Sequence, residues 1–323
     1  MNKQIDKVLT TMGLQPILVD IGASGAPPKI WDQIAQHSIY LGFDPDIREL
    51  SDLTEGKYSR SIVVNKAVTD LPHEKNVNFY LTKSPFCSST LPPDQVSLAN
   101  YLFSDLFEVE KEESVPASTL NAMLDRLSLP GIDWLKTDSQ GTDLRLFQSI
   151  LKNLRDQVLA VDIEPGLIDA YGGEDLFIDA HREITRQGFW LSNLNICGAV
   201  RMQNLTLDKL ESESAGLILH LQRPSPGWCE ARYLRTVEWL SDHQMPAHRY
   251  SLLWVFAILD EQYGFSLDIA HAYSQRFGDD EFASLLKAIP LTILKSKRVR
   301  KILSIGTMRR YTRNLANSLG FLK

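Results

Sequence analysis

Residues 17–25 read ILVDIGASG, and this stretch decides the fold class. Its first five residues are apolar except for Asp20, which is the pattern of a buried strand. Gly22 ends the run, and the small residues after it allow a backbone to approach a ligand closely. Pro28 opens a helical stretch at about 28–36, where its missing N–H needs no partner. The pattern predicts a strand, a tight turn and a helix.

The same alternation of elements continues along the chain. Four further apolar runs predict strands, at residues 39–43, 61–68, 132–137 and 157–163. Helical stretches are expected at about 46–54, 116–127, 142–154 and 177–187. A hairpin or excursion is expected at 76–91, an edge strand at 107–115, and a closing antiparallel pair at 189–194 and 199–205. Strands that alternate with helices predict an α/β fold with a mostly parallel sheet.

The last third of the chain predicts a different organisation. From about residue 228 the apolar period is 3.6, so helices are expected, with the Trp and Tyr residues of 228–273 in their core. We place the domain boundary between 222 and 227, where Pro and Gly cluster. Residues 1–222 are then the sheet domain and residues 223–323 a helical domain. Two domains suit a length of 323 residues, at roughly 150 residues per domain.

The composition is that of a globular protein, with 44% hydrophobic and 23% charged residues. The formal net charge of −6 does not favour nucleic acid as a partner. No apolar run approaches the roughly 20 residues of a membrane-spanning helix, and the first residues lack the apolar core of a signal peptide. Three cysteines, far apart, predict neither disulfides nor a zinc site. We therefore expect a reduced, cytoplasmic protein.

Charge is divided unevenly along the chain. Residues 282–323 carry ten Lys or Arg and no acidic residue, a charge of +10 against −16 for the rest. Residues 295–323 can be drawn as a basic amphipathic helix, which predicts peripheral contact with the inner face of an anionic membrane. The alternative is that this tail packs on the acidic body of the same chain.

Two features at the ends of the first strands indicate a ligand site. Ser24 and Pro27 replace the second and third glycines of the pattern G-x-G-x-x-G, which argues against a dinucleotide. Asp44 follows the second strand, about 20 residues past the first turn, where a carboxylate can hold ribose hydroxyls. The alternative is that Asp44 only caps the next helix.

Polar side chains also end the fourth and fifth strands. Lys136 and Asp138 share one face of an otherwise apolar strand, at the edge where such sheets bind ligands. The alternative is a buried structural ion pair. Glu164 follows the fifth strand and is a further candidate acid or base. The acidic loop 165–175, with three glycines, is either a substrate lid or a solvated surface loop.

Four segments resemble, in order and spacing, the FkbM family of S-adenosylmethionine-dependent methyltransferases. They are VDIGASG (19–25), GFDPD (42–46), NKAV (65–68) and IDWLKTDSQGTDL (132–144). The resemblance runs from about residue 15 to 205 and is most specific in the last segment. It implies a class I methyltransferase fold, a Rossmann-like sheet of seven strands with the last one antiparallel, and S-adenosyl-L-methionine as cofactor.

The resemblance implies a role for each matched position. Asp20, Gly22 and Ser24 would line the methionine side of the cofactor. Asp44 would bind the ribose hydroxyls, and Asn65 and Ala67 would lie near the adenine. Lys136 and Asp138 would lie at the methyl-transfer site. Gln140 and Asp143 stand where the family usually has Glu, and because hard cations prefer several oxygen anions, we predict no metal.

We expect O-methylation of a hydroxyl on a sugar, a glycan or another secondary metabolite. Asp138, Glu164 or a Lys136 of lowered pKa would take the proton, a contribution of roughly 10²–10⁴-fold. Two other function classes are open: a nicotinamide-dependent oxidoreductase, and a non-catalytic, methyltransferase-like scaffold in glycan assembly. The sequence predicts no oligomeric state.

Overall fold

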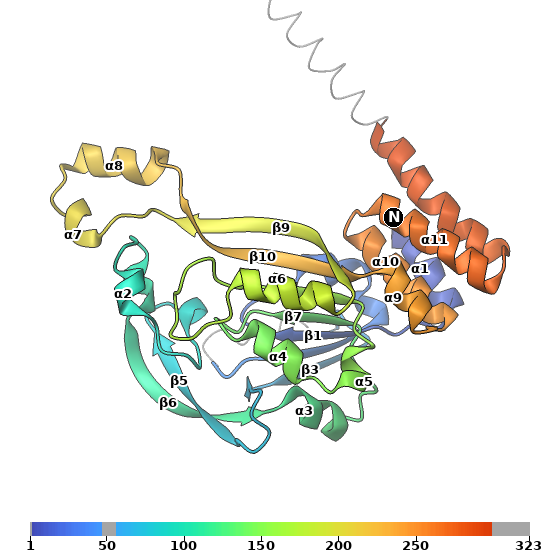
Figure 1. The fold of residues 1–323 in the computed structure, drawn as a ribbon, viewed down its shortest axis with the longest axis horizontal. Helices are drawn as coiled ribbons and strands as arrows, with labels where there is room; N and C mark the ends of the chain where they lie inside the picture. Colours follow the sequence, from blue (N-terminus) through green and yellow to red (C-terminus); the bar gives the residue numbers. More distant parts are fainter. Residues whose placement is uncertain (1, 47–55, 299–323) are drawn as a thin grey trace, which may run out of the picture.

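The computed structural model describes residues 2–46 and 56–298 of the protein. Its centre is a seven-stranded sheet of order β3-β2-β1-β7-β8-β10-β9 (Figure 1). The strands are β1 (Ile17–Ile21), β2 (Ile39–Phe43), β3 (Arg60–Val64), β7 (Trp134–Thr137), β8 (Ala160–Ile163), β9 (Phe189–Ala199) and β10 (Ser225–Arg235). Of these strands, β10 runs against the others. This confirms the predicted fold class, a mostly parallel sheet whose last strand is antiparallel.

The order of the strands places the ligand crevice. The chain builds outward from β1 to β2 and β3, then returns to the other side of β1 with β7 and β8. All five residues of β1 and of β2 are buried, as expected for central strands covered on both faces. A crevice forms outside the carboxyl ends of β1 and β7, where the strand order reverses.

Helices cover both faces of the sheet. One face carries α3 (Leu120–Arg126), α4 (Asp143–Ser149), α5 (Lys152–Arg155) and α6 (Phe177–Arg186). The other carries α1 (Asn2–Thr11), the short 3₁₀ helices η1 (Lys29–Gln33) and η2 (Ala35–His37), and α9 (Val237–Asp242), α10 (Ala247–Leu259) and α11 (Tyr263–Phe277). Residues 281–298 are also helical.

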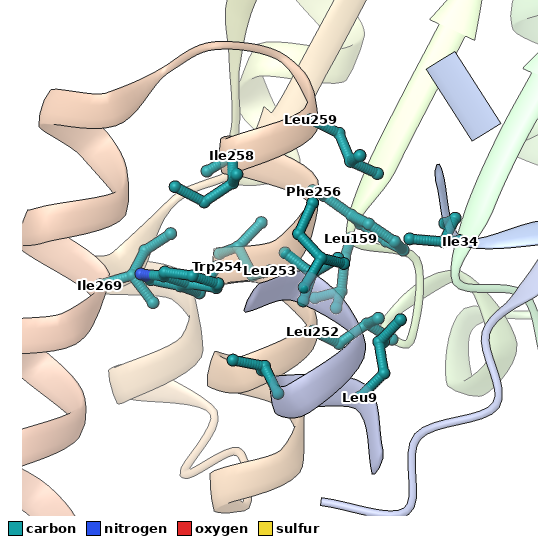
Figure 2. Packing of buried hydrophobic residues seen from close by; sticks show 14 of the residues in the cluster. Leu9, Ile34, Leu159, Leu252, Leu253, Trp254, Phe256, Ile258, Leu259 and Ile269 are labelled. Carbon is teal, nitrogen blue, oxygen red and sulfur yellow. The ribbon is translucent and has the colours of Figure 1, made fainter. Parts of the chain in front are cut away.

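Helix α10 is the centre of the second face. All its residues from Arg249 to Leu259 are buried, because α1, α11 and the sheet surround it. In Figure 2, Leu252 points toward Leu9 of α1 and Trp254 toward Ile269 of α11. The helices predicted after residue 228 therefore complete the core beside the sheet.

The end of the sheet differs from the prediction. Residues 225–235 form β10, whereas the sequence predicted helix from about residue 228, and β10 pairs with β9 along its length. The stretch 199–205, predicted as the partner strand, instead leads into α7 (Asn204–Leu207) and α8 (Ser212–Leu221) at the tip of a long arm (Figure 1). The sequence predicts that Pro226 and Gly227 belong to a linker. In the structure they belong to β10, whose pairing with β9 shifts register between Pro226 and Trp228. The predicted boundary at 222–227 therefore falls at the start of a sheet strand.

A second, three-stranded sheet accounts for the predicted excursion. It consists of β4 (Ala67–Val68), β5 (Asn76–Thr82) and β6 (Val109–Ser118), in the order β4-β6-β5. Between β5 and β6 the chain forms η3 (Pro85–Cys87), α2 (Gln95–Leu98) and η4 (Ser104–Phe107). The predicted strand 61–68 is thus divided between two sheets, as β3 and β4.

Two of the predicted helices differ in the structure. The predicted helix 28–36 is two 3₁₀ helices, and the predicted helix 142–154 is broken into α4 and α5 at Ile150, whose backbone is extended. Thr119 caps α3 by accepting a hydrogen bond from the Ala122 N–H at 3.3 Å. The predicted helix 46–54 lies, apart from its first residue, outside the described residues.

No helix within residues 2–46 and 56–298 is long and apolar enough to cross a membrane. The amphipathic helix predicted at 295–323 lies outside the described residues from 299 onward.

Candidate active site

A narrow cleft lies at the carboxyl ends of β1, β2 and β7. Five of the positions predicted to bind the cofactor or act in catalysis line it: Gly22, Ser24, Asp44, Ala67 and Asp138. The segment between β4 and β6 forms the facing wall, with Phe79, Phe86, Ser88 and Thr90. The cleft therefore combines carboxylates and hydroxyls with an apolar wall, as a nucleoside ligand requires.

Gly22 sets the shape of the turn after β1. Its φ is +76°, and a Cβ added there would lie 2.1 Å from the carbonyl oxygen of Asp138. The N–H groups of Gly22 and Ala23 both donate to the carbonyl of Phe43, at 2.9 and 3.0 Å. Glycine is thus required here, because the exits of β1 and β7 touch at this point.

Lys136 and Asp20 form an ion pair beneath the cleft. Lys136 Nζ lies 3.0 Å from Oδ1 of Asp20 and 3.8 Å from Oδ2 of Asp138. It also donates to the carbonyl of Gly22 at 3.0 Å. The Tyr40 hydroxyl donates to the other Asp20 oxygen at 3.1 Å. Asp20 is 2% exposed, and neither Asp20 nor Lys136 lines the cleft. The pair therefore reaches the cleft only through the contacts of Lys136 with Gly22 and Asp138.

The charges around Lys136 exclude it as a neutral base. Burial lowers its pKa, but the charges of Asp20 and Asp138 raise it further, so the net pKa lies above its ordinary value. The expectation of a lowered lysine pKa is therefore wrong. Lys136 is a cation that holds the ends of β1 and β7 together.

Asp138 is held by the residue two positions on. Gln140 Nε2 donates to Oδ1 of Asp138 at 2.5 Å, and Tyr171 donates its hydroxyl to Gln140 Oε1 at 2.8 Å. A glutamate at position 140 could not donate to Asp138, whereas an amide donates and accepts at once. Gln140 thus orients Asp138 by a hydrogen bond, where an ionised carboxylate would repel it.

Glu164 lies deeper, after β8. Burial raises its pKa to about 9, and the charges of Asp138 and Asp143 add to the effect. Glu164 is therefore protonated at neutral pH, a form that can donate a hydrogen bond. Two carboxyl groups in different environments at one site are suited to different roles.

Asp44 and Asn65 have separate functions at the end of β2. Asp44 lines the cleft, and its Oδ1 accepts a hydrogen bond from the Asp46 N–H at 2.8 Å, so it both faces the cleft and orders the turn. Burial raises the pKa of Asp44 to about 6. The Asn65 amide donates to the carbonyls of Asp44 and Pro45, at 2.9 and 3.1 Å, and Asn65 does not line the cleft. Lys66 lines it instead.

A second pocket of about 400 Å³ opens beyond Asp138. It shares Asp138, Gln140 and Phe86 with the first cleft, and Glu164 lies in its wall. Aromatic side chains supply much of the remaining lining: Phe103, Phe107, Tyr171 and Trp228. The first cleft and this pocket therefore form two chambers that meet at Asp138.

The loop 165–175 is a packed wall of this pocket rather than a solvated loop. Tyr171 is buried, and the Gly172 N–H donates to the carbonyl of Pro92 at 2.8 Å. Arg145 pairs with Asp175 at 2.9 Å and fixes the end of the loop.

Sequence reasoning missed the aromatic residues of the second pocket. Phe103 precedes the predicted edge strand at 107–115 and Phe107 is its first residue, and neither belongs to a recognisable motif. The sequence predicts Trp228 in a helical core, whereas it lies on β10 and lines the pocket. Its position directly after Pro226 and Gly227 was the available signal, since both residues favour an irregular strand.

No family model and no curated protein matches the sequence. A similar solved structure is a TehB-like SAM-dependent methyltransferase from Corynebacterium glutamicum, with 11% sequence identity and a TM-score of 0.28. The similarity covers 72% of this chain and 88% of that one. The order of the strands and the crevice at their ends define the class I methyltransferase fold.

Proposed function

We propose that the protein is an S-adenosylmethionine-dependent O-methyltransferase that acts on a hydroxyl of a sugar or a secondary metabolite, as the FkbM resemblance implies. The observation that carries the proposal is the shared wall between the two chambers. Asp138 lines both the cleft that would hold the cofactor and the pocket that would hold the acceptor. A group at that wall can contact both reactants.

The residues of the first cleft fit the cofactor. Asp44 offers a carboxylate to ribose hydroxyls, and the apolar side chains of Ala67, Val68 and Phe79 suit a purine. Ser24 and Gly22, at the close approach of β1 and β7, suit the methionine portion. When bound, S-adenosylmethionine supplies an activated methyl group on a sulfonium cation.

The chain's own groups position the acceptor and move its proton. The acceptor oxygen would gain the methyl group as the bond between that group and the cofactor sulfur breaks, which leaves S-adenosylhomocysteine. Asp138 would accept the proton that the acceptor oxygen loses. Gln140 fixes the orientation of Asp138, and the protonated Glu164 can donate a hydrogen bond to the acceptor. General base help contributes roughly 10²–10⁴-fold, and holding two reactants in place contributes about 7–11 kcal/mol.

Calorimetric titration with S-adenosylhomocysteine, S-adenosylmethionine and NAD tests the proposal. We expect both adenosyl compounds to bind and NAD not to bind. Binding of NAD alone would favour an oxidoreductase. Binding of none of the three would favour a scaffold without catalytic activity.

A further inference from the structure

A chain of aromatic rings forms one side of the second pocket. The Phe103 ring is stacked with Trp228 at 6.2 Å between centroids and meets Phe107 edge to face at 5.1 Å. The centroid of the Phe107 ring in turn lies 5.6 Å from the centroid of the Tyr171 ring. Rings in such contact form a rigid, apolar wall with few rotatable bonds, which suits a flat or cyclic ligand.

Carboxyl groups are prominent in the polar lining of the pocket. Its ionisable carboxyl groups are Asp138, Glu164 and Glu174, and no Lys, Arg or His is among the described residues that line it. Burial raises the pKa of Glu174 to about 7, although backbone hydrogen bonds oppose the shift. A phosphate or carboxylate bound here would be desolvated beside carboxyl groups, and the nearby cation Lys136 is already paired with Asp20 and Asp138, so binding of an anion is unfavourable.

The lining of the pocket combines polar groups with aromatic rings. Asp138 and Gln140 stand at the wall shared with the first cleft. Phe103, Phe107 and Trp228 supply an apolar part of the lining. An unmodified sugar in this pocket would place several hydroxyls against rings that cannot pair with them, at a cost for each buried polar group.

We propose that the second pocket binds an uncharged alcohol whose hydroxyl stands on an apolar ring. The inference rests on the proposed function and names its acceptor class. The hydroxyl lies at Asp138 and Glu164, and the ring packs on Phe103 and Trp228. The rim includes Phe86 and Leu106, which are 61% and 45% exposed, so an apolar extension of the acceptor can pass out over them.

The β9–β10 arm holds this wall in place. Arg201 of the arm donates to the Tyr101 hydroxyl at 3.1 Å, and the Leu102 N–H donates to the carbonyl of Val200 at 3.1 Å. Asn204 donates to Asp105 at 2.7 Å. The segment that carries Phe103 is therefore fixed from the outside by the arm (Figure 1).

Titrations of matched small alcohols test the inference. The probes are cyclohexanol and 4-methylphenol, their anionic counterpart 4-hydroxybenzoate, and glucose, each with and without saturating S-adenosylhomocysteine. We expect a ring alcohol to bind at least about tenfold more tightly than 4-hydroxybenzoate or glucose, a difference of about 1.4 kcal/mol. Tighter binding of glucose or of the anion would overturn the proposal.

Variants of the residues that line the second pocket test whether the ring alcohol binds there. Phe103→Ala and Trp228→Ala should weaken ring-alcohol binding about tenfold and leave S-adenosylhomocysteine binding unchanged. Leu205→Ala, at a residue of α7 that is 71% exposed and outside the pocket, is the matched control. Leu106→Lys, at the exposed rim, should instead improve binding of 4-hydroxybenzoate, and this variant does not depend on a change in the core. Ring-alcohol binding that survives both alanine substitutions would contradict the inference.

The two proposals fail in different ways. Absence of S-adenosylhomocysteine binding would contradict the proposed function, while the titrations without the nucleoside would still decide what the pocket binds. Normal nucleoside binding together with a preference for glucose or the anion would contradict the acceptor class alone.

Discussion

Lys136 Nζ lies 3.0 Å from Oδ1 of Asp20, and this ion pair joins neighbouring strands, since Lys136 and Asp20 are in register across β7 and β1. Replacing Lys136 by Met leaves a buried carboxylate without its counter-charge. Breaking a buried pair in this way costs about 3–5 kcal/mol. We therefore expect Lys136→Met to lower the free energy of unfolding by that amount in urea denaturation.

The double variant separates this effect from simple loss of packing. Asp20→Asn keeps an acceptor for the Tyr40 hydroxyl and removes the charge, so Lys136→Met with Asp20→Asn should lose less stability than the two single variants together. Lys152→Met, which breaks the exposed pair with Asp156, should change stability by less than about 1 kcal/mol. If the double variant loses as much free energy of unfolding as the two single variants together, the pair does not stabilise the fold.

The catalytic role proposed for Asp138 can be tested by substitution. Asp138→Asn keeps the shape of the side chain and removes the base, so we expect turnover to fall by roughly 10²–10⁴-fold. Affinity for S-adenosylmethionine should be nearly unchanged. Asp169→Asn, at an exposed position in the loop 165–175, serves as the control. Unchanged turnover in Asp138→Asn would remove this residue from the mechanism.

Glu164 makes stability depend on pH. Because burial raises its pKa from 4.5 to about 9, the folded state binds a proton that the unfolded chain releases. Its contribution is fully present below pH 4.5 and is lost as the pH rises toward 9. Urea denaturation at pH 6 and pH 9 should therefore show a larger loss of stability in the wild type than in Glu164→Gln. Equal losses in the two proteins would show that Glu164 is ionised in both states.

The sequence predicts the parts of this fold that depend on local pattern. The runs at 17–21 and 39–43 are strands at the predicted residues, because each is continuous, apolar and bounded by turn residues. Strand β10 was missed, because its register shift at Pro226 and Trp228 interrupts the alternation by which a strand is recognised. Pairing with β9 and β8, which is a tertiary effect, determines its structure.

In the site, too, local pattern predicts some features and tertiary contacts determine the others. Gly22, Asp44 and Asp138 follow strands at a predictable edge, so their meeting in one cleft follows from topology. The raised pKa of Lys136 could not be predicted from the sequence, because it depends on Asp20, its neighbour on the adjacent strand. The rings of Phe103, Phe107 and Trp228 come from two distant segments, and no local pattern brings them together.

Asp44 provides a test of the cofactor site that does not require the acceptor. A carboxylate that accepts hydrogen bonds from ribose hydroxyls contributes about 1.5–3 kcal/mol, because bonds to charged groups are the stronger ones. Asp44→Asn should therefore weaken S-adenosylhomocysteine binding roughly 10- to 100-fold in calorimetric titration. Asp32→Asn, at an aspartate that pairs with Lys57 and does not line the cleft, should bind as the wild type does.

The pH dependence of that affinity identifies the group responsible. Burial raises the pKa of Asp44 to about 6, so the carboxylate becomes protonated as the pH falls through 6 and loses acceptor strength. Wild-type affinity for S-adenosylhomocysteine should thus fall between pH 7 and pH 5. Glu174 and Asp143 titrate in the same range, with pKa values raised by burial to about 7 and about 6, but both are retained in the Asn variant. In Asp44→Asn the fall between pH 7 and pH 5 should therefore be largely absent. A variant that keeps the full pH dependence would place the titrating group elsewhere and leave Asp44 as a residue that only orders the turn.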